Sequence, residues 1–318
     1  MLPLEDPHQP NQASSVIRVE KIQTRTGSRY RIAKVTPLLI AALTVMSAST
    51  RSQDIQSLDA YLLFYSSFDD TTDVNLFGPD NDAGWIYTSE STRRAQVWMN
   101  NRCPEVSIAT GEGKLGDCLK FSGRSKQVLF YQASPNLVLP RKNWTGTVSF
   151  WLKPEIASSA KGTCYPVQLC DGNWNHGGFF VRFLGKPSSR FEFGVVSSGD
   201  DSQTFDSPDD LPKERVLITS VESGRIPEEE WTLVTFSFEN VNPDGDQKSL
   251  SRLFLNGELA GQIQQPLEVL WMQPNALNNE HDAAIFLGIH YVGSIDELRV
   301  YRRALPETTL KRLHQEGE

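Results

Sequence analysis

The sequence has few residues of the kinds that build metal and redox centres. Its 318 residues include five histidines and four cysteines, Cys103, Cys118, Cys164 and Cys170. No Cys-x-x-Cys pair occurs and the histidines are scattered, which argues against a zinc site. The Gly-x-Ser-x-Gly motif of serine hydrolases and the His-Glu-x-x-His motif of metalloproteases are missing too. The sequence therefore carries no signature of these hydrolytic chemistries.

The chain also lacks an excess of positive charge. Its formal net charge is −8 at pH 7, and the first 49 residues hold six basic side chains against three acidic ones. The remainder is therefore more acidic than the whole chain. Such a body repels phosphate backbones and anionic lipid, so we expect no nucleic-acid partner.

No apolar run is long enough to cross a bilayer, which takes about 20 residues. The apolar run near the N-terminus, residues 35–46, follows the basic segment and precedes the small residues Ser47, Ala48 and Ser49. This order is typical of a secretory signal. We interpret 1–49 as a polar leader with a signal segment, 50–59 as a linker, and the protein as exported. The alternative is an uncleaved segment, which would then be the chain's only contact with a membrane.

An even number of cysteines in an exported chain favours disulfides, and four cysteines allow three connectivities. Local pairing is the prediction, Cys164 with Cys170 and Cys103 with Cys118.

From Tyr61 onward, apolar residues recur with period two, as in half-buried strands. Residues 146–153 place Val148, Phe150 and Leu152 on one face, and 190–196 align Phe191, Phe193 and Val195. Asn256-Gly257 between two such runs indicates a hairpin, because both central positions of a type I′ turn need positive φ. Only 305–314 has helical spacing. The pattern predicts an all-β, two-sheet antiparallel β-sandwich with a short C-terminal helix.

Several stretches resemble the laminin-G-like jelly roll of the concanavalin A-like lectin/glucanase superfamily. They are LLFYSSFDD at 62–70, GKLGDCLKFSG at 113–123, TVSFWLKP at 147–154, RLFLNGELAG at 252–261 and SIDELRVYRRAL at 294–305. The last is similar to the family's "xIDEVRIYNRAL" and is the most specific. The resemblance covers about 60–314 and implies one jelly-roll domain there. It also implies relatives that bind sugars or proteins, often with a structural calcium.

Glucanases of this fold carry a Glu-x-Asp-x-x-Glu strand, which places the catalytic carboxylates on one face. The nearest stretch, Glu280-His281-Asp282, does not continue in this way. We therefore expect no enzymatic activity.

Calcium is the expected inorganic partner, because loops at sandwich edges supply carboxylate and carbonyl oxygens. Asp69 and Asp70 follow the first strand and Asp296 lies in the last, and first and last strands of such sandwiches tend to be neighbours. Alternatively, Asp296 and Glu297 pair locally, for instance with Arg299 or Arg302.

Residues 164–178 (CYPVQLCDGNWNHGG) form a cysteine-bearing insertion relative to the family pattern. Trp174 lies there in a polar turn, and its ring would stack on a sugar while neighbouring polar groups bind hydroxyls. The predicted ligand-binding residues are Trp174, Asp171, Asn173, Asn175 and His176. The alternative to a sugar-binding role is that the side chain of Trp174 folds back and covers the core.

These observations predict an exported, non-catalytic binding module whose edge loops recognise a polysaccharide or a surface or extracellular protein. Two alternatives remain: a structural or adhesive protein-interaction domain, and a divergent glycoside hydrolase or lyase.

Overall fold

The structure is a computed structural model that describes residues 58, 60–70, 85–87, 95–97, 105–124, 128–133, 137, 139–155, 162–185, 190–199, 204–205, 207–270 and 283–317. The predicted leader, most of the linker and Cys103 lie outside the described residues. Within the described ranges, no helix is both long and apolar enough to span a membrane.

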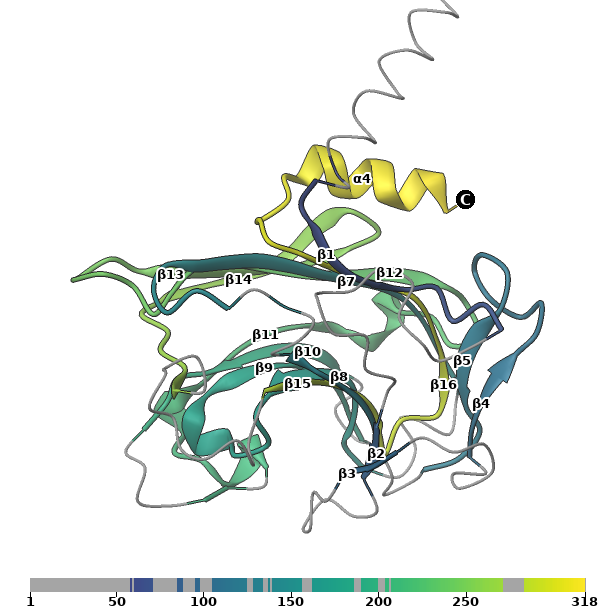
Figure 1. Cartoon of the computed structure of the whole chain (residues 1–318), viewed down its shortest axis with the longest axis horizontal. Helices are drawn as coiled ribbons and strands as arrows, with labels where there is room; N and C mark the ends of the chain where they lie inside the picture. The colour runs from purple at the N-terminus through teal and green to yellow at the C-terminus, as the bar shows by residue number, and fades with distance from the viewer. Residues whose placement is uncertain are drawn as a thin grey trace, which may run out of the picture. The chain divides into compact units, whose positions relative to one another are not determined.

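Two antiparallel sheets form the fold, which confirms the predicted β-sandwich (Figure 1). In the described part of the chain, sheet A has eight strands, and β1 (Leu62–Ser66) pairs with β16 beside the main path. That path runs β14 (Glu258–Gln265), β13 (Ser249–Leu255), β12 (Thr232–Val241), β7 (Trp144–Pro154), β16 (Gly293–Tyr301), β5 (Cys118–Phe121) and β4 (Val106–Ala109).

Sheet B also has eight strands among the described residues. Its order is β11 (Val216–Glu222), β10 (Arg190–Val196), β9 (Gly178–Leu184), β8 (Cys164–Cys170), β15 (Ala284–Ile289), β6 (Val128–Gln132), β2 (Trp85–Tyr87) and β3 (Ala95–Val97). Sheet B is curved, and its concave side faces away from sheet A (Figure 1).

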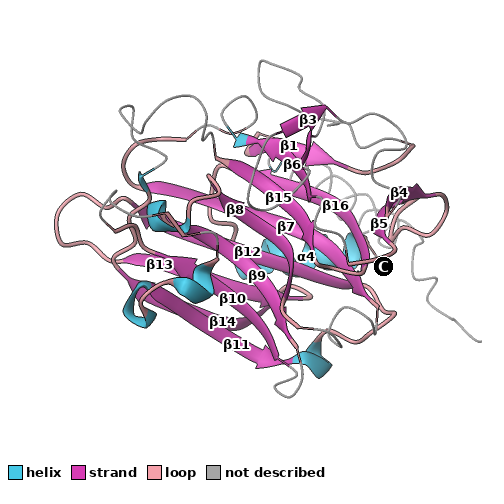
Figure 2. Ribbon diagram, turned by 90° about the horizontal axis from the view of Figure 1, so that it is seen from below, coloured by secondary structure: helices cyan, strands magenta, loops and turns pink. Residues whose placement is uncertain are grey.

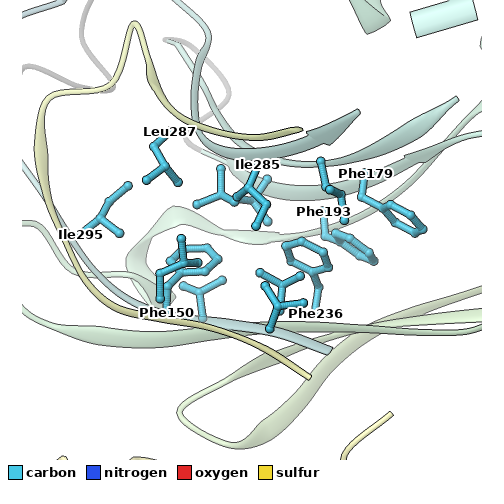
Figure 3. Close-up of a cluster of buried hydrophobic side chains, with 14 of the residues drawn as sticks. Phe150, Phe179, Phe193, Phe236, Ile285, Leu287 and Ile295 are labelled. Atoms are coloured by element: carbon cyan, nitrogen blue, oxygen red, sulfur yellow. The ribbon is translucent and has the colours of Figure 1, made fainter. Parts of the chain in front are cut away.

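The core lies between the sheets and is built from the alternating residues that the sequence indicates. Val148, Phe150 and Leu152 of β7 are all buried there, as are the inward residues of β10 and β12. Phe236 of sheet A packs on Phe193 of sheet B with ring centroids 5.1 Å apart (Figure 3). Burial of these apolar side chains is the main force that holds the two layers together.

The local signals also hold. Asn256 and Gly257 join β13 to β14 with φ of 52° and 77°, as the hairpin requires. The predicted terminal helix is α4 (Glu307–Glu316), with Pro306 at the N-cap. Leu310 of α4 is fully buried against the outer face of sheet A, beside Phe254 and Tyr301.

Candidate functional site

The concave outer face of sheet B carries a second hydrophobic cluster, separate from the core between the sheets. Figure 2 shows the strands that form this face lying side by side. Their register places Phe180, Gln168, Phe286 and Phe130 in one row across β9, β8, β15 and β6. All four side chains are buried, and Trp174 of the loop after β8 packs on Phe180. This row of side chains therefore lies between the sheet and the loop that carries Trp174.

The predicted ligand-binding turn is the first of two segments that pack on this face. The carboxylate of Asp171 contacts Nδ1 of His176 through Oδ2 and accepts the backbone N–H of Asn173 through Oδ1, at 2.9 Å. Asn173 Oδ1 accepts the backbone N–H of Asn175 at 3.0 Å and caps the short 3-10 helix η1 (Trp174–His176). Arg215 Nη1 donates to Asn175 Oδ1 at 2.7 Å. These bonds make the turn a rigid polar structure.

Trp174 lies beneath this turn and not on its surface. Its side chain is 1% exposed and meets the ring of Phe180 edge to face, with centroids 5.6 Å apart. A ring in this position has no free face for a sugar, so the structure corresponds to the alternative in which Trp174 folds back over the core. Asp171, Asn175 and His176 are also buried, and Asn173 is half-buried. Whether the turn binds a ligand stays a prediction.

The second segment that packs on this face brings an aromatic ring to the surface. Phe205 packs against the outer-face cluster and is half-buried. Its backbone N–H donates to Asn173 Oδ1 at 3.1 Å, and its carbonyl accepts the N–H of Trp174 at 2.9 Å. The turn at 171–176 thus holds the backbone of Phe205 in place. The partly exposed aromatic residue on this face is therefore Phe205, whereas the sequence predicted Trp174.

A buried charge cluster lies beside these loops. Arg182 of β9 donates through Nε to Glu192 Oε2 of β10 at 2.8 Å, and through Nη1 to Asp209 Oδ1 at 2.5 Å. Arg182 and Glu192 are each 5% exposed, whereas the side chain of Asp209 is 52% exposed. Asp209 belongs to the 3-10 helix η2 (Pro208–Asp210), so the cluster ties a surface loop to the sheet.

Tyr165 completes the cluster. Its hydroxyl donates to Asp209 Oδ2 at 3.4 Å and accepts from Arg182 Nη1 at 3.4 Å. Burial, followed by the charge of Asp209, raises the pKa of Tyr165 to about 12. The phenol therefore stays protonated and neutral over the whole physiological pH range.

Sequence reasoning missed Phe205, Arg182, Glu192 and Asp209. A signal did exist for two of them: Arg182 and Glu192 are single charges inside apolar strands, GFFVRFL and RFEFGVV. Such a residue is rarely buried unless it is paired. Phe205 and Asp209 lie in a loop rich in Asp, Ser and Pro, where no periodicity distinguishes one position from the next.

The predicted calcium ligands converge on one loop at the edge of sheet A. Strands β1 and β16 are neighbours, as expected. Asp296 Oδ2 accepts the backbone N–H groups of Lys114 and Leu115, at 2.8 and 3.0 Å, and Asp69 Oδ1 accepts that of Asp117 at 2.9 Å. The carboxylate of Asp70 is exposed.

Asp296 is fully buried, and this burial raises its pKa to about 7 against the lowering effect of its backbone donors. The acids therefore fasten a loop. Among the described residues, no group of three or more His, Cys, Asp or Glu side chains could hold a metal ion. Calcium at Asp69, Asp70 and Asp296 stays a prediction, and a fall in melting temperature on adding a chelator would support it.

The predicted disulfide between Cys164 and Cys170 is wrong. The two residues are the ends of the seven-residue strand β8. At roughly 3.3 Å per residue they lie about 20 Å apart, whereas bridged Cα atoms are within about 7 Å of each other. Local pairing was predicted for an insertion, but the residues between the two cysteines are an extended, fully buried strand. Cys118 has a free buried thiol, and its predicted partner Cys103 lies outside the described residues.

The family model of the concanavalin A-like lectin/glucanases superfamily matches residues 123–311, more than half of the chain. The chain belongs to this superfamily. The match confirms the resemblance seen in the motifs from 147 to 305 and agrees with the two-sheet architecture. No curated protein matches the chain in sequence.

Solved structures of the same fold include the binding domain of botulinum neurotoxin DC in complex with SialylT. It is 11% identical, with a TM-score of 0.50, and the match covers 82% of this chain and 52% of that one. The serotype D binding domain is 12% identical (TM-score 0.48, coverage 82% and 52%). Domain 4 of AbnA, a GH43 extracellular arabinanase from Geobacillus stearothermophilus solved with arabinotriose, is 18% identical (TM-score 0.44, coverage 80% and 98%). The chain spans about half the length of the two neurotoxin domains, and at 11% identity the likeness to the DC domain is one of fold alone.

Proposed function

We propose that this member of the lectin/glucanase superfamily is a non-catalytic binding module that recognises carbohydrate at the outer face of sheet B. The observation that carries the proposal is the placement of Phe205. Phe205 is half-buried against the outer-face cluster, and its backbone N–H and carbonyl each form a hydrogen bond with the turn at 171–176. A partly exposed aromatic ring with polar groups nearby suits the C–H face and the hydroxyls of a sugar.

The polar groups that would accompany Phe205 are Asn173 and Asp209. Asn173 is half-buried and touches Phe205 directly, and the half-exposed Asp209 follows four residues along the chain. Both are held in place before any ligand arrives, Asn173 by η1 and Asp209 by Arg182. Preorganised groups lose little conformational entropy on binding, which favours recognition of a polar ligand.

The charge cluster supports a binding role over a catalytic one. Hydrolysis of a glycosidic bond takes two carboxyl groups, one as general acid and one as base or nucleophile. Glu192 and Asp209 are both bound to the guanidinium of Arg182. Neither is presented to a ligand as an unpaired acid, and the Glu-x-Asp-x-x-Glu strand of the glucanases is missing from the sequence.

The proposal includes export and a single binding domain over 60–314. The export part of the proposal rests on the basic leader, the apolar stretch at 35–46 and the small residues after that stretch. Analysis of the N-terminus of the protein recovered from its native host tests this part. A start near residue 50 supports export with cleavage, and an intact leader would contradict cleavage and favour the uncleaved alternative.

A glycan array with the full chain tests the ligand class, followed by calorimetry on any sugar retained. We expect Phe205→Ala and Asp209→Ala each to weaken binding at least about tenfold, a loss of about 1.4 kcal/mol. Glu239→Ala is the control, because Glu239 forms a surface ion pair with Arg252 on sheet A. Sugar binding that survives Phe205→Ala would contradict the site. An array without hits, with a protein captured instead, favours the adhesive alternative; loss of a polysaccharide substrate on incubation favours the hydrolase.

A further inference from the structure

A cavity of about 220 Å³ lies on the outer face of sheet A, opposite the face to which the carbohydrate site is assigned. Trp151 and Tyr301 line it from sheet A, Leu62 from β1, Leu115 from the loop at 111–117 and Leu313 from α4. An engineered apolar cavity of about 150 Å³ is known to bind benzene. The space under α4 is thus large enough for one substituted ring.

The cavity wall contains a guanidinium with unused donors. Arg299 contacts the buried carboxylate of Glu297 through Nη2, and its guanidinium lies 4.6 Å from the ring centre of Tyr65. Glu297 is 2% exposed and also accepts the hydroxyl of Tyr65 at 2.9 Å, so Arg299 is held in one orientation. Among the described residues, its Nε and Nη1 donate no hydrogen bond. They are the donor pair that a carboxylate would use.

A second cation, Lys114, lies over Trp151, one of the residues that line the cavity. Nζ of Lys114 is 4.6 Å from the ring centre of Trp151. Asp296 holds the backbone of Lys114 and Leu115, so the loop that carries this ammonium is anchored. In the described part of the chain, no acidic side chain pairs with Lys114. The one acid of the lining, Glu316, lies 3.8 Å from Arg312.

We infer that this cavity binds a small organic carboxylate, with its apolar body against Trp151 and its charge on Arg299 and Lys114. Charge decides the ligand class. Both cations have capacity to spare, whereas the nearby carboxylates of Glu297 and Glu316 already have basic partners. A neutral ring would gain only the apolar contacts, and an amine would meet two cations.

Benzoate, benzyl alcohol and benzylamine are suitable probes, because they share the ring and differ in charge. Binding to the full chain is followed by calorimetry and by ligand-observed NMR. We expect benzoate to bind at least about tenfold more tightly than benzyl alcohol, and benzylamine not to bind. Leu313→Trp fills the cavity and abolishes benzoate binding. Lys114→Ala weakens binding by about three- to tenfold, the range of a partly exposed charge.

Lys153→Ala is the matched control. Lys153 also lies over a tryptophan, 4.9 Å from the ring centre of Trp231, but Trp231 does not line the cavity, whereas the Trp151 ring under Lys114 does. This variant should bind benzoate as the unsubstituted chain does. The inference is overturned if benzoate does not bind at about 10 mM, or if benzyl alcohol binds equally well. It is also overturned if Leu313→Trp leaves binding intact or Lys153→Ala weakens it as much as Lys114→Ala. Glycan binding is a separate readout, so this inference and the proposed function can fail independently.

Discussion

Nη1 of Arg182 lies 2.5 Å from Oδ1 of Asp209, and this contact joins strand β9 to the loop that crosses the outer face of sheet B. On the sheet side, Nε of the same guanidinium holds Glu192 at 2.8 Å. One cation thus serves two acids of very different burial, Glu192 at 5% exposure and the Asp209 side chain at 52%. Removing the guanidinium of Arg182 and removing the carboxylate of Asp209 should therefore lower the free energy of unfolding by different amounts.

Arg182→Met should lower the free energy of unfolding by about 3–5 kcal/mol, because it leaves the carboxylate of Glu192 buried without a counter-ion. Asp209→Ala should cost only about 1 kcal/mol, since water screens its half-exposed ion pair. Urea denaturation of the variants measures both. Asp210→Ala is the control, as an exposed neighbour with an expected change within about 0.5 kcal/mol. Equal losses for Arg182→Met and Asp209→Ala would show that burial does not set the cost.

Trp174→Ala should destabilise the protein by about 3–5 kcal/mol, because it empties the space between the turn and Phe180. Trp174→Phe keeps an aromatic contact and should cost less. Thermal unfolding followed by circular dichroism measures both variants. If Trp174→Ala weakened sugar binding with no loss of stability, the indole would contact the ligand after all, as the sequence first suggested.

Tyr165 should make stability fall at high pH. Its pKa is raised from 10.0 to about 12 in the folded protein. Between these values the unfolded chain has lost the proton that the folded chain keeps, so ionisation favours unfolding as the pH rises. Tyr165→Phe should remove this contribution between about pH 10 and 12, as measured by urea denaturation at each pH. Tyrosinate absorbance gives a second check by comparing the titration of the unsubstituted chain with that of Tyr165→Phe. If the variant lacks a group that titrates near pH 10 instead of near pH 12, the raised pKa of Tyr165 is contradicted.

The thiol of Cys164 should react slowly with alkylating reagents in the folded protein. Burial raises its pKa to about 12, and a protonated, inaccessible thiol reacts poorly with alkylating reagents. We expect slow labelling of Cys164 and Cys118 in the native state and rapid labelling in urea, with mass spectrometry locating the sites. A peptide that links Cys164 to Cys170 in non-reduced digests would refute the placement of both on β8.

Much of the fold could be predicted because its signals are local. The alternation through Val148, Phe150 and Leu152 determines which face of β7 is buried, and Asn256-Gly257 determines the hairpin, whatever the rest of the chain does. Both depend on backbone geometry over a few residues. The motifs near the ends of the domain likewise indicated that β1 and β16 are neighbours.

The sequence by itself thus determined strands such as those at 146–153 and 190–196 with their buried faces, the terminal helix and the superfamily. Only the tertiary structure decided that Cys164 and Cys170 lie at opposite ends of one strand and that Trp174 faces inward. It also decided that Phe205, Arg182 and Asp209 meet on sheet B. The physical reason is that burial periodicity is set by neighbours along the chain, whereas ion pairs and loop placement depend on residues that only the folded sheets bring together.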